Sequence, residues 1–384
     1  MASKIDLQDH TILVLPFTPS LLRDPSPLYS PILDLLPRSS KKSFTVFFST
    51  PAGAISSEKS AIQSIPGVGS NQEQLYSLLK RAPQESFKTL QSFLGHIYTA
   101  LWTAQWKCEN VLLDVEVHFE GESGELGAKL LRGKNGEEEY QLIKVEGMQE
   151  TDLVASLDEI IPSPFTQLSL PFTSLSSLQS EPYTLSNHGR TPGFPVVALG
   201  GTFDRIHAAH KFLLHLGYFL AREKLIVGVM ADDLLQTKTR ADLVQPLNQR
   251  LDGVNAFLGR LGDGSIKLDV LEIHDALGPT KSDPNVQALV VSRETLSGGE
   301  YVNATRKKSG LQELELFVVD VIAESEDVNL KEEVDEGKLK KMKMGSTGMR
   351  NWIAERGTAD PITELKAKCS INASQAVVQA PSAE

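Results

Sequence analysis

Short apolar segments alternate with helix-like patterns through the second half of the chain. Apolar runs rich in Val, Ile and Leu predict strands over 196–199, 225–230, 267–273, 288–291 and 314–322. Apolar positions at helical spacing predict helices over 207–222, over about 247–261 and near Tyr301. Because strands that alternate with helices form right-handed crossovers, this half is predicted to be an open, mainly parallel α/β sheet.

The first half shows a second set of strand and helix signals. Strands are predicted over 11–15, 43–48, 111–119 and 140–145. Between them, apolar and aromatic positions from Phe87 to Trp102 recur at near-helical spacing, which predicts one long helix with its aromatic rings in a core. This half is therefore expected to be a separate α/β domain, and its sequence indicates no chemistry.

Composition along the chain predicts where the domains end. A segment rich in Ser, Thr and Pro, 162–195, is expected to be a linker between an N-terminal domain of unknown role, 1–161, and a second domain, 196–356. An acidic run, 324–336, is expected to be a solvated insertion in the second domain. The polar segment 357–384 is expected to be disordered.

Composition also excludes some classes of protein. The 384 residues, 41% of them apolar, suffice for two domains with a core each. The net charge of −11 argues against a broad nucleic-acid interface, which usually presents a basic face. No window approaches the roughly 18 consecutive apolar residues that span a bilayer, so no membrane partner is expected.

Cysteine usage and the first residues bear on the compartment. Cys108 and Cys369 lie in separate regions, which predicts neither a disulfide framework nor a zinc cluster and suits a reducing compartment. The first six residues lack the charged and then apolar layout of a secretory signal. We expect a cytoplasmic protein, with the nucleus as the alternative.

The segment after the strand at 196–199 carries the strongest chemical signal. Gly200-Gly201-Thr202-Phe203-Asp204 forms a glycine turn, and a helix follows that carries His207 and His210 in its first turn. A helix N-terminus presents unsatisfied N–H groups, so two imidazoles beside it make a site suited to phosphate. The alternative is that the glycines and histidines serve only the fold.

A second motif, Gly345-Ser346-Thr347-Gly348-Met349-Arg350, lies far downstream. Two hydroxyls between glycines, with a guanidinium at a helix-compatible distance, are a second candidate phosphate site. The hydroxyls can also serve only as helix caps. Both uses are compatible, because a capped helix N-terminus also binds anions.

Taken together, these motifs resemble those of a known family. G-G-T-F-D-x-x-H-x-x-H is similar to the signature of nucleotidyltransferases related to class I aminoacyl-tRNA synthetases. With K-x-x-S-T-x-x-R, and with S-x-E-T-x-x-G-G-x-x-x-N-x-x-R over 292–306, the chain resembles the phosphopantetheine adenylyltransferases in their eukaryotic, fungal-type form. The resemblance covers about 196–356. Ala209 replaces the glycine that the family has before its second histidine.

The resemblance implies a Rossmann-like nucleotidyltransferase domain and a reaction. AMP passes from ATP, with Mg²⁺, to 4'-phosphopantetheine, giving 3'-dephospho-coenzyme A and pyrophosphate in coenzyme A biosynthesis. The attacking phosphate has a second pKa of about 6, so it is largely dianionic at neutral pH and needs no general base. The resemblance leaves open an association with other enzymes of coenzyme A synthesis.

It also implies three roles at the reacting phosphates. His210, with His207 beside it, is expected on the α- and β-phosphates of ATP, and Thr202 on the reacting phosphates. Lys238 follows the second strand of the domain and matches a family lysine that steadies the attacking phosphate. Three cations near it in the sequence compete for this role: Lys224, Arg240 and Arg250.

The remaining nucleotide-binding positions come from both motifs. They are Gly200, Gly201, Phe203, Ser346, Thr347 and Arg350. The last three are expected on the β- and γ-phosphates. Arg306 is a further phosphate candidate, although the two lysines after it are typical of an exposed helix face. Asp204 is expected to fix the turn, and no metal ligand is assigned.

Three other functions share some of these features. A cytidylyltransferase of lipid head-group synthesis would have the first motif, but its second usually reads R-T-x-G-x-S-T, which this chain lacks. An aminoacyl-tRNA synthetase would need a tRNA-binding domain that the sequence does not indicate. A non-catalytic scaffold that keeps the fold and binds partners through its first half is favoured by Ala209 and by the unassigned N-terminal domain.

Overall fold

The computed structural model describes most of both halves of the chain. It covers residues 5, 7–51, 74–122, 140–145, 166–168, 192–262, 264–320 and 345–356. The predicted acidic insertion, 324–336, and the predicted disordered segment, 357–384, lie outside these residues. Most of the predicted linker does so as well.

The second half forms one parallel five-stranded sheet. Its strands are β6 (Phe194–Gly201), β7 (Ala221–Met230), β8 (Lys267–Ile273), β9 (Ala288–Ser292) and β10 (Glu315–Val319). Their spatial order is β10-β9-β6-β7-β8, and every neighbouring pair is parallel. This is the order of a doubly wound sheet with its switch point between β6 and β9. The predicted Rossmann-like fold is confirmed.

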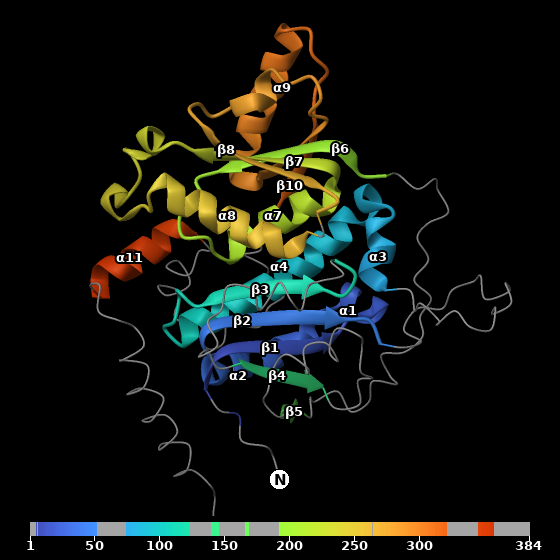
Figure 1. The fold of residues 1–384 in the computed structure, drawn as a ribbon, viewed down its shortest axis with the longest axis vertical. Coiled ribbons are helices and arrows are strands. Elements are labelled where there is room, and N and C mark those ends of the chain that lie inside the picture. Colours follow the sequence, from blue (N-terminus) through green and yellow to red (C-terminus); the bar gives the residue numbers. More distant parts are fainter. Residues whose placement is uncertain are drawn as a thin grey trace, which may run out of the picture.

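Four described helices accompany this sheet. They are α7 (Ala208–Leu220), α8 (Leu247–Leu261), α9 (Leu296–Lys308) and α11 (Ser346–Arg356). Figure 1 shows α7 and α8 on the side of the sheet that faces the first half of the chain, and α9 on the other side. The bounds of α8 and β8 are those that the apolar pattern predicts. The other predicted strands lie within two to three residues of the observed ones, apart from the longer N-terminal end of β7.

The first half forms a second parallel five-stranded sheet. Its strands are β1 (Gln8–Pro16), β2 (Ser40–Ser49), β3 (Asp114–Phe119), β4 (Tyr140–Val145) and β5 (Thr166–Leu168). Their order is β3-β2-β1-β4-β5, so this sheet has the same strand order as the second one. The predicted N-terminal α/β domain is confirmed. β5 lies inside the predicted linker, and the exact domain boundary stays a prediction.

The helices of the first half were only partly predictable. They are α1 (Pro19–Arg23), α2 (Tyr29–Ser39), α3 (Leu75–Lys80) and α4 (Pro83–Lys107). The predicted long helix is α4. The sequence did not indicate α1 to α3, because α1 and α3 are short and Pro31 and Pro37 obscure the helical pattern of α2.

Short 3-10 helices complete the described secondary structure. They are η1 (Ser26–Leu28), η3 (Asp232–Leu235), η4 (Ala241–Leu243), η5 (Gly278–Lys281) and η6 (Arg293–Thr295). None of the described helices has both the length and the apolar character of a bilayer span.

The two sheets share one hydrophobic core. Apolar residues of both halves belong to a single buried cluster, in which α4 packs against α7. Tyr98 of α4 lies 6.1 Å, between ring centroids, from Phe212 of α7. At the other end of α7, Lys80 donates a hydrogen bond of 2.8 Å to the carbonyl of Tyr218. The two halves are therefore packed as one body around α7.

A matched pair of glycine substitutions tests the packing of α7. A β-carbon at Gly217, in α7, would lie 2.4 Å from a methyl group of Leu199 in β6, whereas one at Gly259, in α8, would meet nothing within 4 Å. We expect Gly217→Ala to lower the free energy of unfolding by about 1–3 kcal/mol through overpacking. Gly259→Ala is expected to raise it by up to about 1 kcal/mol, because alanine favours the helix. Urea unfolding measures both, and equal effects would contradict the packing described.

Candidate active site

The glycine turn begins with Gly200 and Gly201, the last two residues of β6, at the switch point of the second sheet. Phe203 and Arg205 adopt left-handed backbone conformations, with φ of 52° and 48°. Such conformations cost about 1–3 kcal/mol for residues other than glycine and persist only where surrounding contacts enforce them. Those contacts converge on Gln245: its backbone N–H donates to Asp204 Oδ1 at 2.9 Å, and its side-chain oxygen accepts from Arg205 N at 2.7 Å. The turn is therefore held in one conformation.

The buried guanidinium of Arg250 stabilises the turn through hydrogen bonds to backbone carbonyls. Arg250, 1% exposed, donates to the carbonyls of Thr202 at 2.8 Å, Met230 at 2.7 Å and Gln245 at 2.9 Å. It also pairs with Asp232. Arg250 therefore joins the carboxyl ends of β6 and β7. This structural role explains its presence near Lys238 in the sequence without a role at the attacking phosphate.

The rings of the two histidines lie against each other, with His207 just before the helix rather than in its first turn. His207 is the N-cap residue of α7, and its ring stacks on that of His210 with centroids 3.9 Å apart. His207 Nε2 lies 3.2 Å from Ser346 Oγ, which itself donates to the carbonyl of Asp204 at 2.9 Å. Because that hydroxyl proton is used, His207 must donate from Nε2. Nδ1 of each ring is buried without a hydrogen-bond partner in the described part of the chain, so of the two imidazoles only His207 is held by a described hydrogen bond.

Both imidazoles are neutral at pH 7. Burial lowers the pKa of His210 to about 4, although Asp204 acts in the opposite direction. Burial also holds the pKa of His207 well below 6.5, and His210, Lys211 and Arg350 lower it further. The pair therefore offers N–H donors to a phosphate without bringing full positive charges.

The second motif lies directly against the first. Arg350 of α11 is 2% exposed, pairs with Asp204 and donates to the carbonyl of Thr239 at 2.9 Å. It also donates to Thr347 Oγ1 at 3.2 Å. Together with the contact of His207 and Ser346, these bonds bring two motifs more than 130 residues apart in the sequence to one place.

Other predicted residues take distinct positions. Lys238 is exposed in the segment after β7. Thr202 Oγ1 lies 3.6 Å from Met230 Sδ. Gly200 is exposed at the carboxyl end of β6, where a ligand can approach its backbone. The ring of Phe203 is wholly buried and lies 5.2 Å from that of His210, so only its backbone is available to a nucleotide.

Arg306 lies elsewhere, which corrects its place among the phosphate candidates. Its side chain is wholly buried rather than on an exposed helix face. It donates to four backbone carbonyls: those of Thr280, Asp283, Val286 and Gln312. Val286 and Gln312 precede β9 and β10, so these bonds hold the amino ends of the strands, at the opposite edge from the glycine turn.

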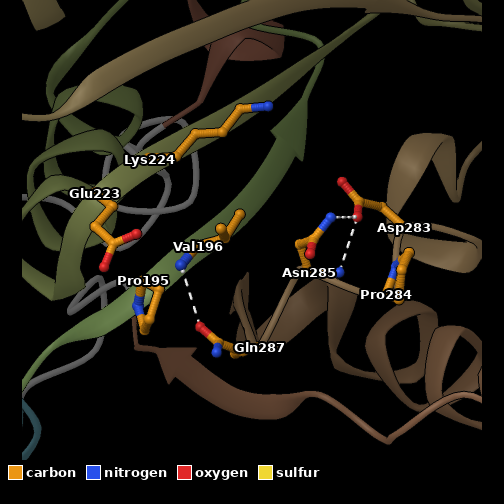
Figure 2. A pocket seen from close by; sticks show the side chains of 8 residues that line it. All are labelled: Pro195, Val196, Glu223, Lys224, Asp283, Pro284, Asn285 and Gln287. Atoms are coloured by element: carbon orange, nitrogen blue, oxygen red, sulfur yellow. Dashed lines mark hydrogen bonds between the residues drawn. The ribbon is translucent and has the colours of Figure 1, made fainter.

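A cavity at that opposite edge does not belong to the site. Figure 2 shows it beside the first residues of β6 and β7. Its polar groups have partners: Val196 N donates to Gln287 Oε1 at 3.2 Å, Asp283 accepts from Asn285 N at 2.8 Å, and Lys224 pairs with Asp269 at 2.6 Å. Ligands of doubly wound sheets bind at the carboxyl ends of strands, so the cavity is not the predicted nucleotide site.

One neighbour of the histidines was not predicted. Trp102 of α4, in the first half of the chain, lies 5.7 Å from the His207 ring between centroids. The helical spacing of its sequence predicts only that Trp102 lies in a core. Such spacing cannot show which other domain the helix contacts.

The fold and these two motifs define a nucleotidyltransferase. The sequence model of the cytidylyltransferase-like family matches residues 198–340. The chain is 33% identical, over 129 residues, to the phosphopantetheine adenylyltransferase of Pyrococcus abyssi, spanning 34% of this chain and 80% of that protein. The chain belongs to the phosphopantetheine adenylyltransferase family.

The match to a yeast relative covers a smaller share of that relative. The chain is 38% identical, over 149 residues, to the phosphopantetheine adenylyltransferase of Saccharomyces cerevisiae, which covers 39% of this chain and 48% of that protein. It thus spans about half the length of this yeast relative. A solved structure of a protein of unknown function from Archaeoglobus fulgidus is 28% identical, with a TM-score of 0.31, over 34% of this chain and 92% of that one.

The titration of His210 tests the geometry of the site. In the free protein its imidazole is expected to titrate with a midpoint of about 4. The unfolded chain takes up this proton near pH 6.5, so His210 lowers the stability of the fold as the pH falls from about 6.5 to 4. ATP is expected to raise the midpoint, because a phosphate stabilises the imidazolium. The NMR signal of Cε1–H, assigned with His210→Gln, measures both values; a midpoint near 6.5 without ligand would contradict the burial described.

Proposed function

We propose that the chain is a pantetheine-phosphate adenylyltransferase that transfers AMP from ATP to 4'-phosphopantetheine. The products are 3'-dephospho-coenzyme A and pyrophosphate. The observation that carries the proposal is the meeting of the histidine pair with Ser346 and Arg350 at the carboxyl end of β6. The choice of substrates rests on the names of the relatives in yeast and archaea.

The chemistry needs positioning more than acid or base catalysis. A 4'-phosphate oxygen attacks the α-phosphorus of ATP, a new P–O bond forms, and the bond to the β-phosphate oxygen breaks. The electron pair of that bond leaves with pyrophosphate. The nucleophile is already an anion with a second pKa of about 6, so no proton has to be removed. The two neutral histidines are consistent with this requirement.

His210 is the proposed donor to the α-phosphate. Its ring stands at the N-terminus of α7, where backbone N–H groups also point at the site. His207, which donates to Ser346 in the free protein, is proposed to turn this donor to the β-phosphate when ATP binds. Thr202 and the backbone of Gly200 and Gly201 complete the contacts with the reacting phosphates.

Further residues are proposed to bind the leaving pyrophosphate and the attacking phosphate. Ser346, Thr347 and Arg350 are proposed to bind the β- and γ-phosphates, with Arg350 shared between these and Asp204. Lys238 is exposed and follows the strand next to β6, so its ammonium can reach an incoming phosphate. It is proposed to steady the attacking group.

Magnesium enters this proposal with its substrate. Among the described residues, no three His, Cys, Asp or Glu side chains form a group that could hold a metal ion. Mg²⁺ usually binds through substrate phosphates and water with few protein ligands, so we propose MgATP as the substrate. The bound ion would offset negative charge on the phosphates. We propose the cytoplasm as the compartment, in keeping with two cysteines that lie far apart in the sequence.

Pyrophosphate release tests the proposed function. The full chain is incubated with Mg²⁺ and either ATP plus 4'-phosphopantetheine or CTP plus phosphocholine. We expect release with the first pair only, and a loss of about 10²–10³-fold in kcat for His210→Ala, since it removes a donor to the transition state.

A matched histidine provides the control. His96 lies half-buried on α4, where Nδ1 is 2.7 Å from the carbonyl of Ser92, and His96→Ala is expected to keep the wild-type rate. Release with the CTP pair would favour the lipid-precursor function instead. No release with either pair, at intact folding, would favour the scaffold.

A further inference from the structure

The residue that follows His210 anchors α7 in the first domain. Lys211 is 1% exposed, and its ammonium donates to the carboxylate of Asp114, to the carbonyl of Val115 at 3.0 Å and to Glu116 Oε1 at 3.1 Å. All three acceptors belong to β3 of the first sheet. The three N–H groups of this ammonium are therefore all used across the boundary between the two sheets.

Glu116 links this anchor to a second helix. Arg260 of α8 donates to both oxygens of Glu116, one of them from Nε at 2.8 Å. His118 Nε2 lies 3.1 Å from the same carboxylate. Burial raises the pKa of Glu116, but Lys211, His118 and Arg260 outweigh it and hold that pKa well below its ordinary value. The ionised carboxylate of Glu116 thus binds both α7 and α8, the helices on the side of the second sheet that faces the first half.

Trp102 provides a direct contact between the first domain and the candidate site. The indole is 3% exposed and lies against the His207 ring, which in turn stacks on His210. The ring of Phe203 lies 5.2 Å from that of His210 between centroids. The positions of both imidazoles are therefore set between α4 and the glycine turn.

The first turn of α7 has little local support. Its N-cap residue makes no side-chain capping bond, and the turn carries no acidic residue to offset the helix dipole. A helix start without such support depends on tertiary contacts for its position. From the first domain, the contacts described at this end of α7 include those of Trp102 and Lys211, and from the second domain His207 is bonded to Ser346.

We infer that the N-terminal domain positions the nucleotide site. Trp102, Glu116 and Lys211 act as positioning residues: they fix the rotation and the height of the first turn of α7, so that His207 and His210 face the phosphates. The inference rests on the proposed function for its kinetic test. Because misplacement of a catalytic group by 1 Å can cost about 10²-fold in rate, a domain that contributes no reacting group still determines the rate.

Lys211→Met is the first test. This variant keeps the length of the side chain and removes the ammonium, which leaves Glu116 with Arg260 and His118 as partners. At a temperature where circular dichroism shows the variant folded, we expect kcat to fall about tenfold or more. We also expect the midpoint of the His210 titration to rise from about 4 toward 6.5, as the first turn becomes more exposed.

Lys80→Met is the matched control. Lys80 also joins the first domain to α7, but it donates to Tyr218 at the other end of the helix. We expect this variant to keep kcat within about twofold of the wild type and to leave the His210 midpoint in place, because distant sites act independently. Equal effects of both lysine substitutions would show that the interface only stabilises the fold and would overturn the inference.

Trp102→Leu tests the direct contact without removing a buried charge, and it also serves if Lys211→Met does not fold. We expect a lower kcat per folded molecule and a shifted His210 midpoint, whereas Trp102→Phe, which keeps an aromatic ring, restores much of both. Folded Trp102→Leu with wild-type kcat and midpoint would contradict the inference.

The titration separates this inference from the proposed function. It reads the surroundings of His210 without turnover. A wild-type chain that releases no pyrophosphate would refute the proposed reaction alone, and the effects of Lys211→Met and Lys80→Met on the midpoint would still decide whether the first domain positions the site.

Discussion

The burial of α7 between two sheets is the constraint on which the rest of the structure depends. One side of the helix packs on β6, where Gly217 allows Leu199 to approach, and the other side packs on α4 and β3. Most of its 13 residues are buried, including charged Lys211. Because the histidines lie at the start of this helix, α7 in Figure 1, the core that stabilises both halves also determines where the proposed phosphate-binding groups lie.

Charge is distributed unevenly along that helix. At its start the imidazoles are neutral, and Nδ1 of each has no hydrogen-bond partner among the described residues, which suits this end to the proposed ligand. One residue later, the ammonium of Lys211 is fully compensated by acceptors of β3. Removing one partner of a buried ion pair is costly, because the other partner then remains as an uncompensated buried charge. The arrangement of Lys211 and its acceptors is therefore strongly favoured over alternatives. The ion pairs of Lys211 thus lie next to the histidines. In the proposed function, the histidines exchange their present hydrogen bonds for bonds to a substrate.

The two sheets have the same strand order but differ at their switch points. In the second sheet β6 ends in two glycines, and Gly200 is exposed to an approaching ligand. In the first sheet β1 ends at Pro16, and the ring of Phe17 that follows packs among Phe48, Phe93 and Phe119 at 4.8–5.8 Å. In the first sheet the residue that follows the central strand is therefore buried among aromatic rings, whereas in the second sheet the end of the central strand is exposed. This difference suits the second domain to binding a ligand at this position and the first domain to supporting the second.

The sequence by itself determined the local elements and the two motifs. Apolar runs placed the parallel strands and α8, and the order of strand, glycine turn and histidine helix identified the family, because these patterns are set by neighbours along the chain. It did not reveal α2, whose prolines obscure the helical pattern, or the buried role of Arg306, which looked like part of a basic helix face. The anchoring roles of Lys211, Glu116 and Trp102 were decided only by the tertiary structure. A lysine or a glutamate has the same sequence signature in solvent as in an interface, and only the packing of one sheet against the other's helices shows which of them is buried.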